Sequence, residues 1–298
     1  MYWEKRWFQF AVLLLLAFTW GSSFILMKIG LKSFNNSQAA AIRVFLASLV
    51  LLPFSLKHLK YLKRKDLKSI LIVGFIGSLF PAFLFMKAQT RIDSAMAGML
   101  NSLTPVFTLL IGLLFYKMRF AWKQIIGLSL GLTGALGLIT FGEEVSISNI
   151  NTYAFFIVLA TIFYAINVNE VKAHLTHLTG VQITSLSFLF TGPVALIYLF
   201  TTNFETVIQQ PQWQLHLAAL AALGIIGTAA ALLLLNSLIR RVSPIFAASV
   251  TYIIPIFAIF WGVVDGEKIT MFHLLCIAII LFGVYMINRK RQVSDANK

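Results

Sequence analysis

The amino-acid sequence predicts an all-α integral membrane protein with ten transmembrane helices, arranged as two inverted repeats of five helices each. Three observations predict this class. The 298 residues are 59% hydrophobic and only 11% charged, whereas a water-soluble domain carries about 25% charged residues. Apolar windows long enough to cross a bilayer follow one another along the whole chain. The middle of each half also matches the other half at a constant offset.

The ten expected spans are apolar runs of roughly 20 residues, the length that a helix needs to cross the hydrocarbon core. Runs such as 12–18 and 229–235 are apolar on every face, so they lack the period-two alternation of a membrane β-strand. In chain order the spans are expected at 8–27, 37–56, 67–87, 94–116, 122–141, 151–172, 179–201, 214–237, 244–264 and 270–288.

The joins between these spans are short, and none leaves room for a soluble catalytic or binding domain. Lys5 and Arg6 precede the first span with no small-residue cleavage site after it, so we expect a retained helix rather than a cleaved signal peptide. The most basic join lies between the second and third spans, at 57–66. Such clusters orient membrane proteins and contact anionic lipid head groups. The net charge of +14 therefore indicates membrane contact rather than nucleic-acid binding.

The positions of Lys and Arg predict that both termini face the cytoplasm, because short cytoplasmic joins carry the excess of positive charge. The segments placed inside hold eighteen of these residues: Lys5, Arg6, Lys57, Lys60, Lys63, Arg64, Lys65, Lys68, Lys117, Arg119, Lys123, Lys172, Arg240, Arg241, Arg289, Lys290, Arg291 and Lys298. The segments placed outside hold five: Lys28, Lys32, Lys87, Arg91 and Lys268. We therefore expect a multi-pass protein of the cytoplasmic (cell inner) membrane.

An internal repeat divides the chain at about residue 145. At an offset of 150, Gly74 and Gly77 match Gly224 and Gly227, and Pro105 matches Pro255. At an offset of 144, Ser23 matches Asn167. Each repeat, 1–145 and 146–298, holds an odd number of spans, so the second enters the membrane upside down. Inverted repeats are typical of secondary transporters that bind their substrate near the midplane between the repeats.

Polar side chains within the spans predict where such a substrate binds, because they are costly in lipid unless they face a cavity or another helix. The proposed outer rim comes from the first and fourth spans, with Trp20, Ser23, Asn101 and Thr104. The proposed inner rim comes from the sixth and ninth spans, with Tyr164, Asn167, Thr251 and Tyr252. For any single hydroxyl, a hydrogen bond to its own helix is the simpler interpretation.

Arg43 is the one basic residue inside a span. A guanidinium stays charged and binds carboxylates through two parallel hydrogen bonds, so Arg43 is a candidate anchor for a substrate carboxylate. Snorkelling to the interface and hydrogen bonding to carbonyls are the alternatives. The matched prolines Pro105 and Pro255 each remove a backbone hydrogen bond, which indicates either static kinks or hinges.

The sequence predicts no metal site and no cofactor. Glu170, His174 and His177 share one helical face, but they supply too few ligands, and we interpret them as a solvated helix end. Cys276 is single, which excludes an internal disulfide. The span serines have no histidine at a matching depth, so an intramembrane enzyme is not expected.

The chain resembles the drug/metabolite transporter superfamily, in particular EamA-type permeases, over nearly its whole length. The resemblance rests on Trp20-Gly21-Ser22-Ser23-Phe24, Arg43, the paired prolines, and Gly266-Glu267 followed by Thr270. It implies a ten-helix fold around a central cavity and the export or facilitated movement of amino acids or related metabolites. Where the family often has a second acidic residue matching Glu267, this chain has Lys117.

We therefore expect a transporter of small metabolites such as amino acids that works by alternating access, as an exporter or facilitator. The alternative is multidrug efflux, suggested by 27 Phe, 8 Tyr and 6 Trp. The lack of a deep carboxylate argues against it, since cation binders usually present carboxylates with aromatic faces. The expected partners are a small-molecule substrate and membrane lipid, and the expected state is a monomer or homodimer.

Overall fold

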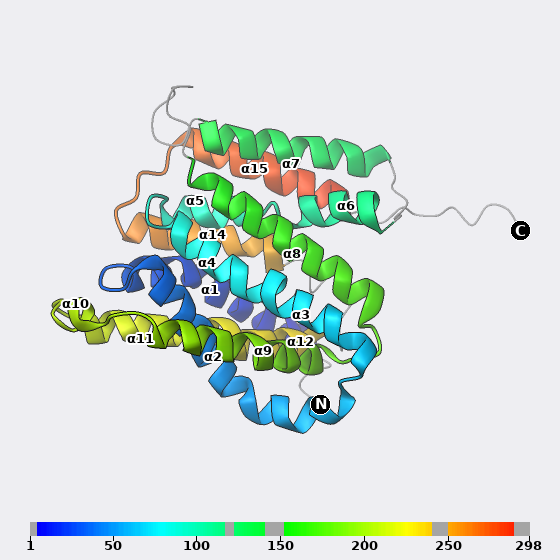
Figure 1. Ribbon diagram of the computed structural model, residues 1–298. Coiled ribbons are helices and arrows are strands. Elements are labelled where there is room, and N and C mark those ends of the chain that lie inside the picture. Colours follow the sequence, from blue (N-terminus) through cyan, green and yellow to red (C-terminus); the bar gives the residue numbers. More distant parts are fainter. Residues whose placement is uncertain (1–4, 117–121, 141–151, 240–249, 289–298) are drawn as a thin grey trace, which may run out of the picture.

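The computed structural model describes residues 5–116, 122–140, 152–239 and 250–288, and every regular element in these stretches is helical (Figure 1). The long helices of the first half are α1 (Arg6–Gly30), α2 (Asn36–His58), α3 (Leu67–Gly74), α4 (Phe80–Ala88), α5 (Ser94–Asn101), α6 (Thr104–Phe115) and α7 (Trp122–Thr140). Those of the second half are α8 (Ala154–His174), α9 (Gly180–Phe200), α11 (Trp213–Gly224), α12 (Ala231–Ile239), α14 (Val250–Val264) and α15 (Met271–Asn288). Short elements are η2 (Leu59–Tyr61), η3 (Arg64–Asp66), η4 (Phe75–Leu79), α10 (Glu205–Ile208) and η6 (Ile225–Ala230).

Seven helical segments in the described residues are long and apolar enough to cross a membrane, which makes the chain a multi-pass membrane protein. They are Trp7–Gly30, Asn36–Tyr61, Arg64–Ala88, Ser94–Phe115, Ala154–His174, Gly180–Phe200 and Trp213–Leu235. Two shorter apolar helices, Ile253–Val264 and Met271–Met286, lie where the ninth and tenth spans are expected. Helix α7 lies at the expected fifth span. The all-helical class is confirmed, and the count of ten spans stays a prediction.

The outer surface of the bundle carries large apolar side chains. Phe200 is 81% exposed, Phe115 73% and Trp122 72%. A soluble protein rarely exposes a contiguous apolar surface of this kind, whereas in lipid such side chains cost nothing. The surface therefore suits a bilayer.

Helices α2 and α9 begin with the same local structure. Asn35 and Gln38 form a capping box at the start of α2, and Thr179 and Gln182 form one at the start of α9. In each box the first side chain accepts from the backbone of the glutamine, whose side chain accepts from the backbone in return. The two boxes lie at the offset of 144 residues at which Ser23 matches Asn167.

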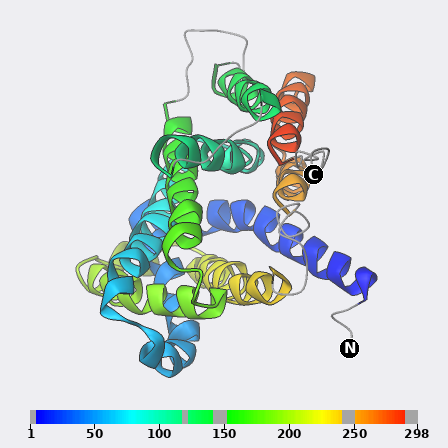
Figure 2. The same cartoon turned by 90° about the vertical axis from the view of Figure 1, so that its right-hand side faces the viewer.

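The helices pack in pairs that join one half of the chain to the other. Helix α2 packs against α9, and α7 packs against α15 at one edge of the molecule (Figures 1 and 2). Helix α1 packs against α14 and α11, while α8 packs against α4 and α6. Exchanging the two halves converts the contacts of α1 into those of α8, so the packing follows the repeat seen in the sequence.

The segments expected as the third and eighth spans each contain a π-helical turn at the centre. η4 interrupts the segment of α3 and α4, and η6 interrupts the segment of α11 and α12. The two turns begin directly after Gly74 and Gly224, which are matched at the offset of 150. Turns of this kind widen a helix locally and occur often at functional sites.

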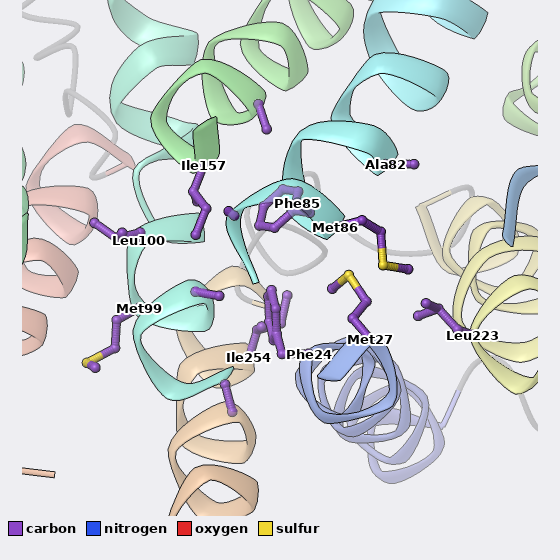
Figure 3. Packing of buried hydrophobic residues seen from close by; sticks show 14 of the residues in the cluster. Phe24, Met27, Ala82, Phe85, Met86, Met99, Leu100, Ile157, Leu223 and Ile254 are labelled. Carbon is purple, nitrogen blue, oxygen red and sulfur yellow. The ribbon is translucent and has the colours of Figure 1, made fainter. Parts of the chain in front are cut away.

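The buried core lies where α1, α4, α5, α8 and α14 meet. Figure 3 shows Phe24 of α1, Phe85 of α4 and Ile254 of α14 among the side chains at this meeting point. The rings of Phe24 and Phe85 lie 6.0 Å apart between centroids. Small residues permit this close packing: an added Cβ at Gly98 would collide with Ala258. Close approach through small residues drives association in lipid, where apolar burial does not.

Candidate functional site

Three predicted site residues surround the π turn η6. The indole nitrogen of Trp20 donates to the carbonyl oxygen of Gly227 at 3.0 Å. An added Cβ at Gly227 would lie 3.1 Å from the hydroxyl of Ser23. The Nε atom of Arg43 donates to the hydroxyl of Thr228 at 3.2 Å. Since the first and second spans both reach η6, the structure brings Trp20, Ser23 and Arg43 to one place.

The π turn η4 has the corresponding neighbour in the other half. An added Cβ at Gly77 would lie 2.5 Å from Cγ of Asn167. Gly77 therefore contacts Asn167 as Gly227 contacts Ser23, its matched counterpart, and the approach at Gly77 is the closer of the two. The Oδ1 atom of Asn167 is buried and has no hydrogen-bond partner among the described residues. A buried unpaired acceptor next to a widened helix turn is a feature expected of a substrate contact.

Ser23 itself follows the simpler interpretation of a span hydroxyl. Its Oγ donates to the carbonyl oxygen of Thr19 at 3.0 Å, and its side chain is 4% exposed. The neighbouring Ser22 accepts instead from the indole nitrogen of Trp261 at 2.8 Å. Trp261 was not among the predicted site residues; its presence in the apolar ninth span, one residue before Gly262, gave no separate signal.

Arg43 is the only positive charge of the second span that lies away from its ends. Besides Thr228, its Nη1 atom contacts the sulfur of Met27 at 3.8 Å, and its charge interacts with the Tyr164 phenol. Among the residues that the structure describes, no carboxylate lies within ion-pair distance of Arg43. A permanent charge held in a membrane protein without a counter-ion marks a functional site by default.

Tyr164 belongs to the same group through its ring. It stacks on Phe85 with centroids 6.1 Å apart and planes 26° apart, and Phe85 in turn contacts Phe24. Tyr164, which interacts with the charge of Arg43, is thereby joined to the aromatic residues of the core. Tyr164 was predicted as an inner-rim residue and Arg43 as a separate carboxylate anchor, and the two lie close enough to interact.

The remaining predicted residues lie away from the π turns, or their side chains fall outside the part of the chain that the structure describes. Thr104 donates its hydroxyl to the carbonyl oxygen of Asn101 at 2.9 Å. These two flank a break between α5 and α6, and Pro105 occupies the first turn of α6. Pro255 lies inside the continuous helix α14. The side chains of Thr251 and Tyr252 lie outside the described residues.

A charged cluster joins the first, fourth and ninth spans at their predicted outer ends. The Lys28 ammonium lies 2.6 Å from a carboxylate oxygen of Asp265 and 2.9 Å from one of Glu267. The Glu267 side chain is 2% exposed. Its two oxygens also accept from the backbone N–H groups of Ser94 and Ala95, at 2.8 and 2.9 Å. Glu267 thus caps the first turn of α5, where a negative charge is favourable.

Gly266 explains how Glu267 reaches this place. Its φ angle of 82° ends α14 in the left-handed region that glycine tolerates. Gly266 N–H donates to Val263, and Glu267 N–H donates to Gly262. This pair of bonds is the Schellman arrangement. The Gly266-Glu267 pair in the sequence is therefore a helix end that delivers a carboxylate to α5.

Glu170 is buried rather than solvated, which corrects our interpretation of this helix end. Its oxygens accept from the hydroxyls of Ser69 at 2.6 Å and Tyr116 at 2.9 Å, and one lies 3.0 Å from His174. His177 pairs with Asp66 instead. Among the residues described, no group of three His, Cys, Asp or Glu side chains is placed to hold a metal. The signal missed in the sequence was Ser69, distant in the chain, which supplies a partner in the third span.

Two surface pockets contain none of the predicted site residues. One, of about 540 Å³, follows α3 and η4; the other, of about 360 Å³, lies between α2, α10 and α11.

Comparison with known proteins identifies the family. The model of the EamA-like transporter family matches residues 7–140 and again residues 151–289. The chain belongs to the EamA-like transporter family. This match confirms the resemblance noted in the sequence. It also supports membrane transport as the general function of the chain.

Three relatives of this EamA-like transporter match it over most of their length. The uncharacterized inner membrane transporter YedA of Escherichia coli (strain K12) is 26% identical over 93% of this chain and 90% of its own. The probable terminal-alkyne amino-acid exporter of Streptantibioticus cattleyicolor is 23% identical over 93% and 92%. The S-adenosylmethionine/S-adenosylhomocysteine transporter of Chlamydia trachomatis serovar L2 is 23% identical over 91% and 86%. All three names describe transporters rather than enzymes.

Proposed function

We propose that this protein moves small metabolites that carry an α-amino acid group across the cytoplasmic membrane, as an exporter or facilitator. Arg43 is the observation that carries the proposal. The guanidinium is held by Thr228 at η6, and among the described residues it has no carboxylate within ion-pair distance. A substrate carboxylate is the counter-ion that this site would take, through charge-assisted hydrogen bonds.

The relatives support this substrate class. One is named for an amino acid with a terminal alkyne, and another for S-adenosylmethionine. Both molecules carry an α-amino and an α-carboxylate group but differ widely in their side chains. A site that anchors the shared carboxylate on Arg43 and accepts varied side chains beside Tyr164 and Phe85 suits both.

We further propose that transport proceeds by alternating access between two inverted five-helix repeats with ten spans in total, divided near residue 145. The contact of Gly77 with Asn167 joins the halves on one side, and that of Gly227 with Ser23 joins them on the other. Because these contacts are matched by the repeat, two conformations of similar energy follow from exchanging their roles. In this proposal Pro105 and Pro255 are the hinges, and the cavity is lined by the two rims and Arg43.

The proposed function is tested by uptake into proteoliposomes that contain the purified chain. Radiolabelled amino acids, nucleosides and sugars are offered separately, with and without an imposed pH gradient. We expect saturable uptake of one or more amino acids without a gradient. Uptake of nucleosides or sugars alone would contradict the substrate class, and efflux of lipophilic cations alone would favour the multidrug alternative.

The role of Arg43 is tested with two variants. We expect Arg43→Met to raise the half-saturation concentration for an amino acid about 10- to 100-fold, the loss expected when a charged hydrogen bond worth about 1.5–3 kcal/mol is removed. Arg43→Lys should retain part of the affinity, because it keeps the charge but not the fork geometry.

Competition separates a carboxylate anchor from a packing role. In the unaltered protein, an amino acid should compete with the labelled substrate, and the corresponding decarboxylated amine should not. In Arg43→Met the two competitors should become nearly equal. Lys32→Gln, an exposed residue beyond α1, removes the same charge as a control. Equal discrimination in Arg43→Met and the control would overturn the assignment.

A further inference from the structure

A groove runs along the exposed face of the third span, from its basic beginning to the π turn η4. It has a volume of about 540 Å³ and is lined by Arg64, Leu67, Lys68, Leu71, Ile72, Phe75 and Ile76. The two cations occupy one end, and apolar side chains line the rest. The groove therefore has the polarity of a lipid, with a charged head and an apolar tail.

The groove follows from the helical period of this segment. Its lining residues recur at intervals of three and four, so they share one face of the helix. Ser69, Ile70 and Val73 on the opposite face are buried, with exposed fractions of 6%, 0% and 6%. After its basic first turn, the segment 64–76 is apolar on both faces. One face packs inside the protein, and the other faces the bilayer.

The positive charge at the head of the groove is not neutralised within the described protein. The segment 57–68 contains one acidic residue, Asp66. Asp66 is 3% exposed and its carboxylate lies 3.0 Å from Nε2 of His177. Among the described residues, no carboxylate lies within ion-pair distance of Arg64 or Lys68. Both side chains are exposed, so an external anion is needed to pair with them.

The length of the groove matches one leaflet of a bilayer. Arg64 and Ile76 are twelve positions apart in the chain, which corresponds to about 18 Å along a helix. The hydrocarbon core is about 30 Å thick, so a single leaflet contributes about 15 Å. An acyl chain that begins at the level of Lys68 would end near η4.

We propose that this groove binds one anionic phospholipid of the cytoplasmic leaflet, with its phosphate on Arg64 and Lys68 and one acyl chain along Leu71, Ile72 and Ile76. Basic pockets on the cytoplasmic side of membrane proteins recognise such head groups. A zwitterionic head group brings its own ammonium close to the two cations and binds less well. The site does not depend on the proposed substrate.

Occupancy of the groove acts on the π turn η4. Phe75 and Ile76 belong both to the groove and to η4, and the next residue, Gly77, packs against Asn167. A bound acyl chain therefore holds η4 in the geometry that places Gly77 beside Asn167 of α8. The lipid stabilises the folded protein because it binds this form and not the unfolded chain.

Thermal unfolding of the delipidated full chain in neutral detergent tests the proposal. The single cysteine, Cys276, is 4% exposed, so its reaction with a thiol-specific fluorophore reports unfolding. Phosphatidylglycerol should raise the midpoint temperature more than phosphatidylcholine does. In Arg64→Gln/Lys68→Gln, the shift caused by phosphatidylglycerol should fall to less than half.

A matched control removes two charges from the same segment outside the groove. Lys60→Gln/Lys63→Gln should keep the full shift. Native mass spectrometry should count one retained phosphatidylglycerol in the unaltered protein and the control, and fewer in Arg64→Gln/Lys68→Gln. Ile72→Trp, which fills the apolar part and leaves the charges, should also reduce retention. Equal losses in the two double variants would show diffuse attraction instead of a site, and equal effects of the two lipids would overturn the proposal.

Discussion

Glu267 connects three parts of the chain through one side chain. Its carboxylate binds the Lys28 ammonium and accepts from two backbone N–H groups at the start of α5. These bonds compensate for the cost of burying the charge, which is high for an unpaired carboxylate. The Lys28 ammonium also lies 2.6 Å from a carboxylate oxygen of Asp265. Lys28 therefore keeps a counter-ion when Glu267 is replaced.

We expect Glu267→Gln to destabilise the folded protein by about 1–3 kcal/mol, because it removes the negative charge while two N–H groups of α5 remain at the site. The reaction of Cys276 with a thiol-specific fluorophore during heating measures the change. Glu205→Gln is the control: Glu205 is exposed at the start of α10, and among the described residues its carboxylate accepts one hydrogen bond, from Asn203 Nδ2 at 3.3 Å. The expected shift for the control is within about 0.5 kcal/mol. Equal midpoints for the two variants would contradict the capping role of Glu267.

At the scale of elements, the two π turns determine where the site residues meet. The wider turn at η6 leaves a carbonyl at Gly227 for the indole of Trp20, and the hydroxyl of Thr228 accepts from Arg43. Backbone groups in lipid must find hydrogen-bond partners within the protein. The carbonyl of Gly227 in the π turn is therefore paired with the Trp20 side chain. At η4, close packing of Gly77 with Asn167 takes the corresponding place.

We expect Gly77→Ala to cost about 1–3 kcal/mol through overpacking, since the new Cβ would lie 2.5 Å from Cγ of Asn167. Gly227→Ala should cost less, because its Cβ would lie 3.1 Å from the Ser23 hydroxyl. Adding Asn167→Ala to Gly77→Ala should restore part of the loss. The thermal midpoints of the unaltered protein, Gly77→Ala, Asn167→Ala and the double variant measure the coupling between Gly77 and Asn167. Additive effects of Gly77→Ala and Asn167→Ala would show that the two residues do not act through contact.

The two halves of the molecule share the same local structures and the same packing pattern. The capping boxes of α2 and α9, the π turns and the packing pairs all recur at matched positions. In the proposed arrangement each half holds five spans, so matched positions lie on opposite sides of the membrane. Lys32 and Thr176 are such a pair, both exposed at helix joins.

Single cysteines introduced into a Cys276→Ala background test this arrangement. In intact cells, an impermeant maleimide should label Lys32→Cys and Gln210→Cys from outside. Lys60→Cys and Thr176→Cys should react only after the membrane is opened. Labelling of Lys32→Cys and Thr176→Cys from the same side would refute inversion of the repeats.

Much of the fold was predictable because a bilayer imposes its thickness on the sequence. The spans at 37–56 and 179–201 lie within two residues of the starts of α2 and α9, since Asn35 and Thr179 cap them. The interruptions at η4, at η6 and between α5 and α6 were not located, because hydropathy does not distinguish an α turn from a π turn. Pro105 was assigned to a bend, and the structure places it directly after a break in the fourth span.

The site was predictable only in part. Polar residues inside spans were visible one by one, so Trp20, Arg43, Tyr164 and Asn167 were named. Their partners Thr228 and Gly77 belong to distant spans, and their contacts depend on how the helices rotate and cross. Glu170 was misjudged for the same reason: it lies near a helix end in the sequence and is buried by another span in the fold.

The sequence by itself determined that this protein is helical, membrane-embedded and internally repeated, because composition, charge bias and matched glycines are properties of the chain alone. Tertiary structure decided which polar groups are paired and which are not. It neutralised Lys28 with Asp265 and Glu267, enclosed Glu170 with Ser69 and Tyr116, and placed Arg43 beside Thr228. Pairing in a low-dielectric interior depends on distances of a few ångströms between spans, and only the packed helices set those distances.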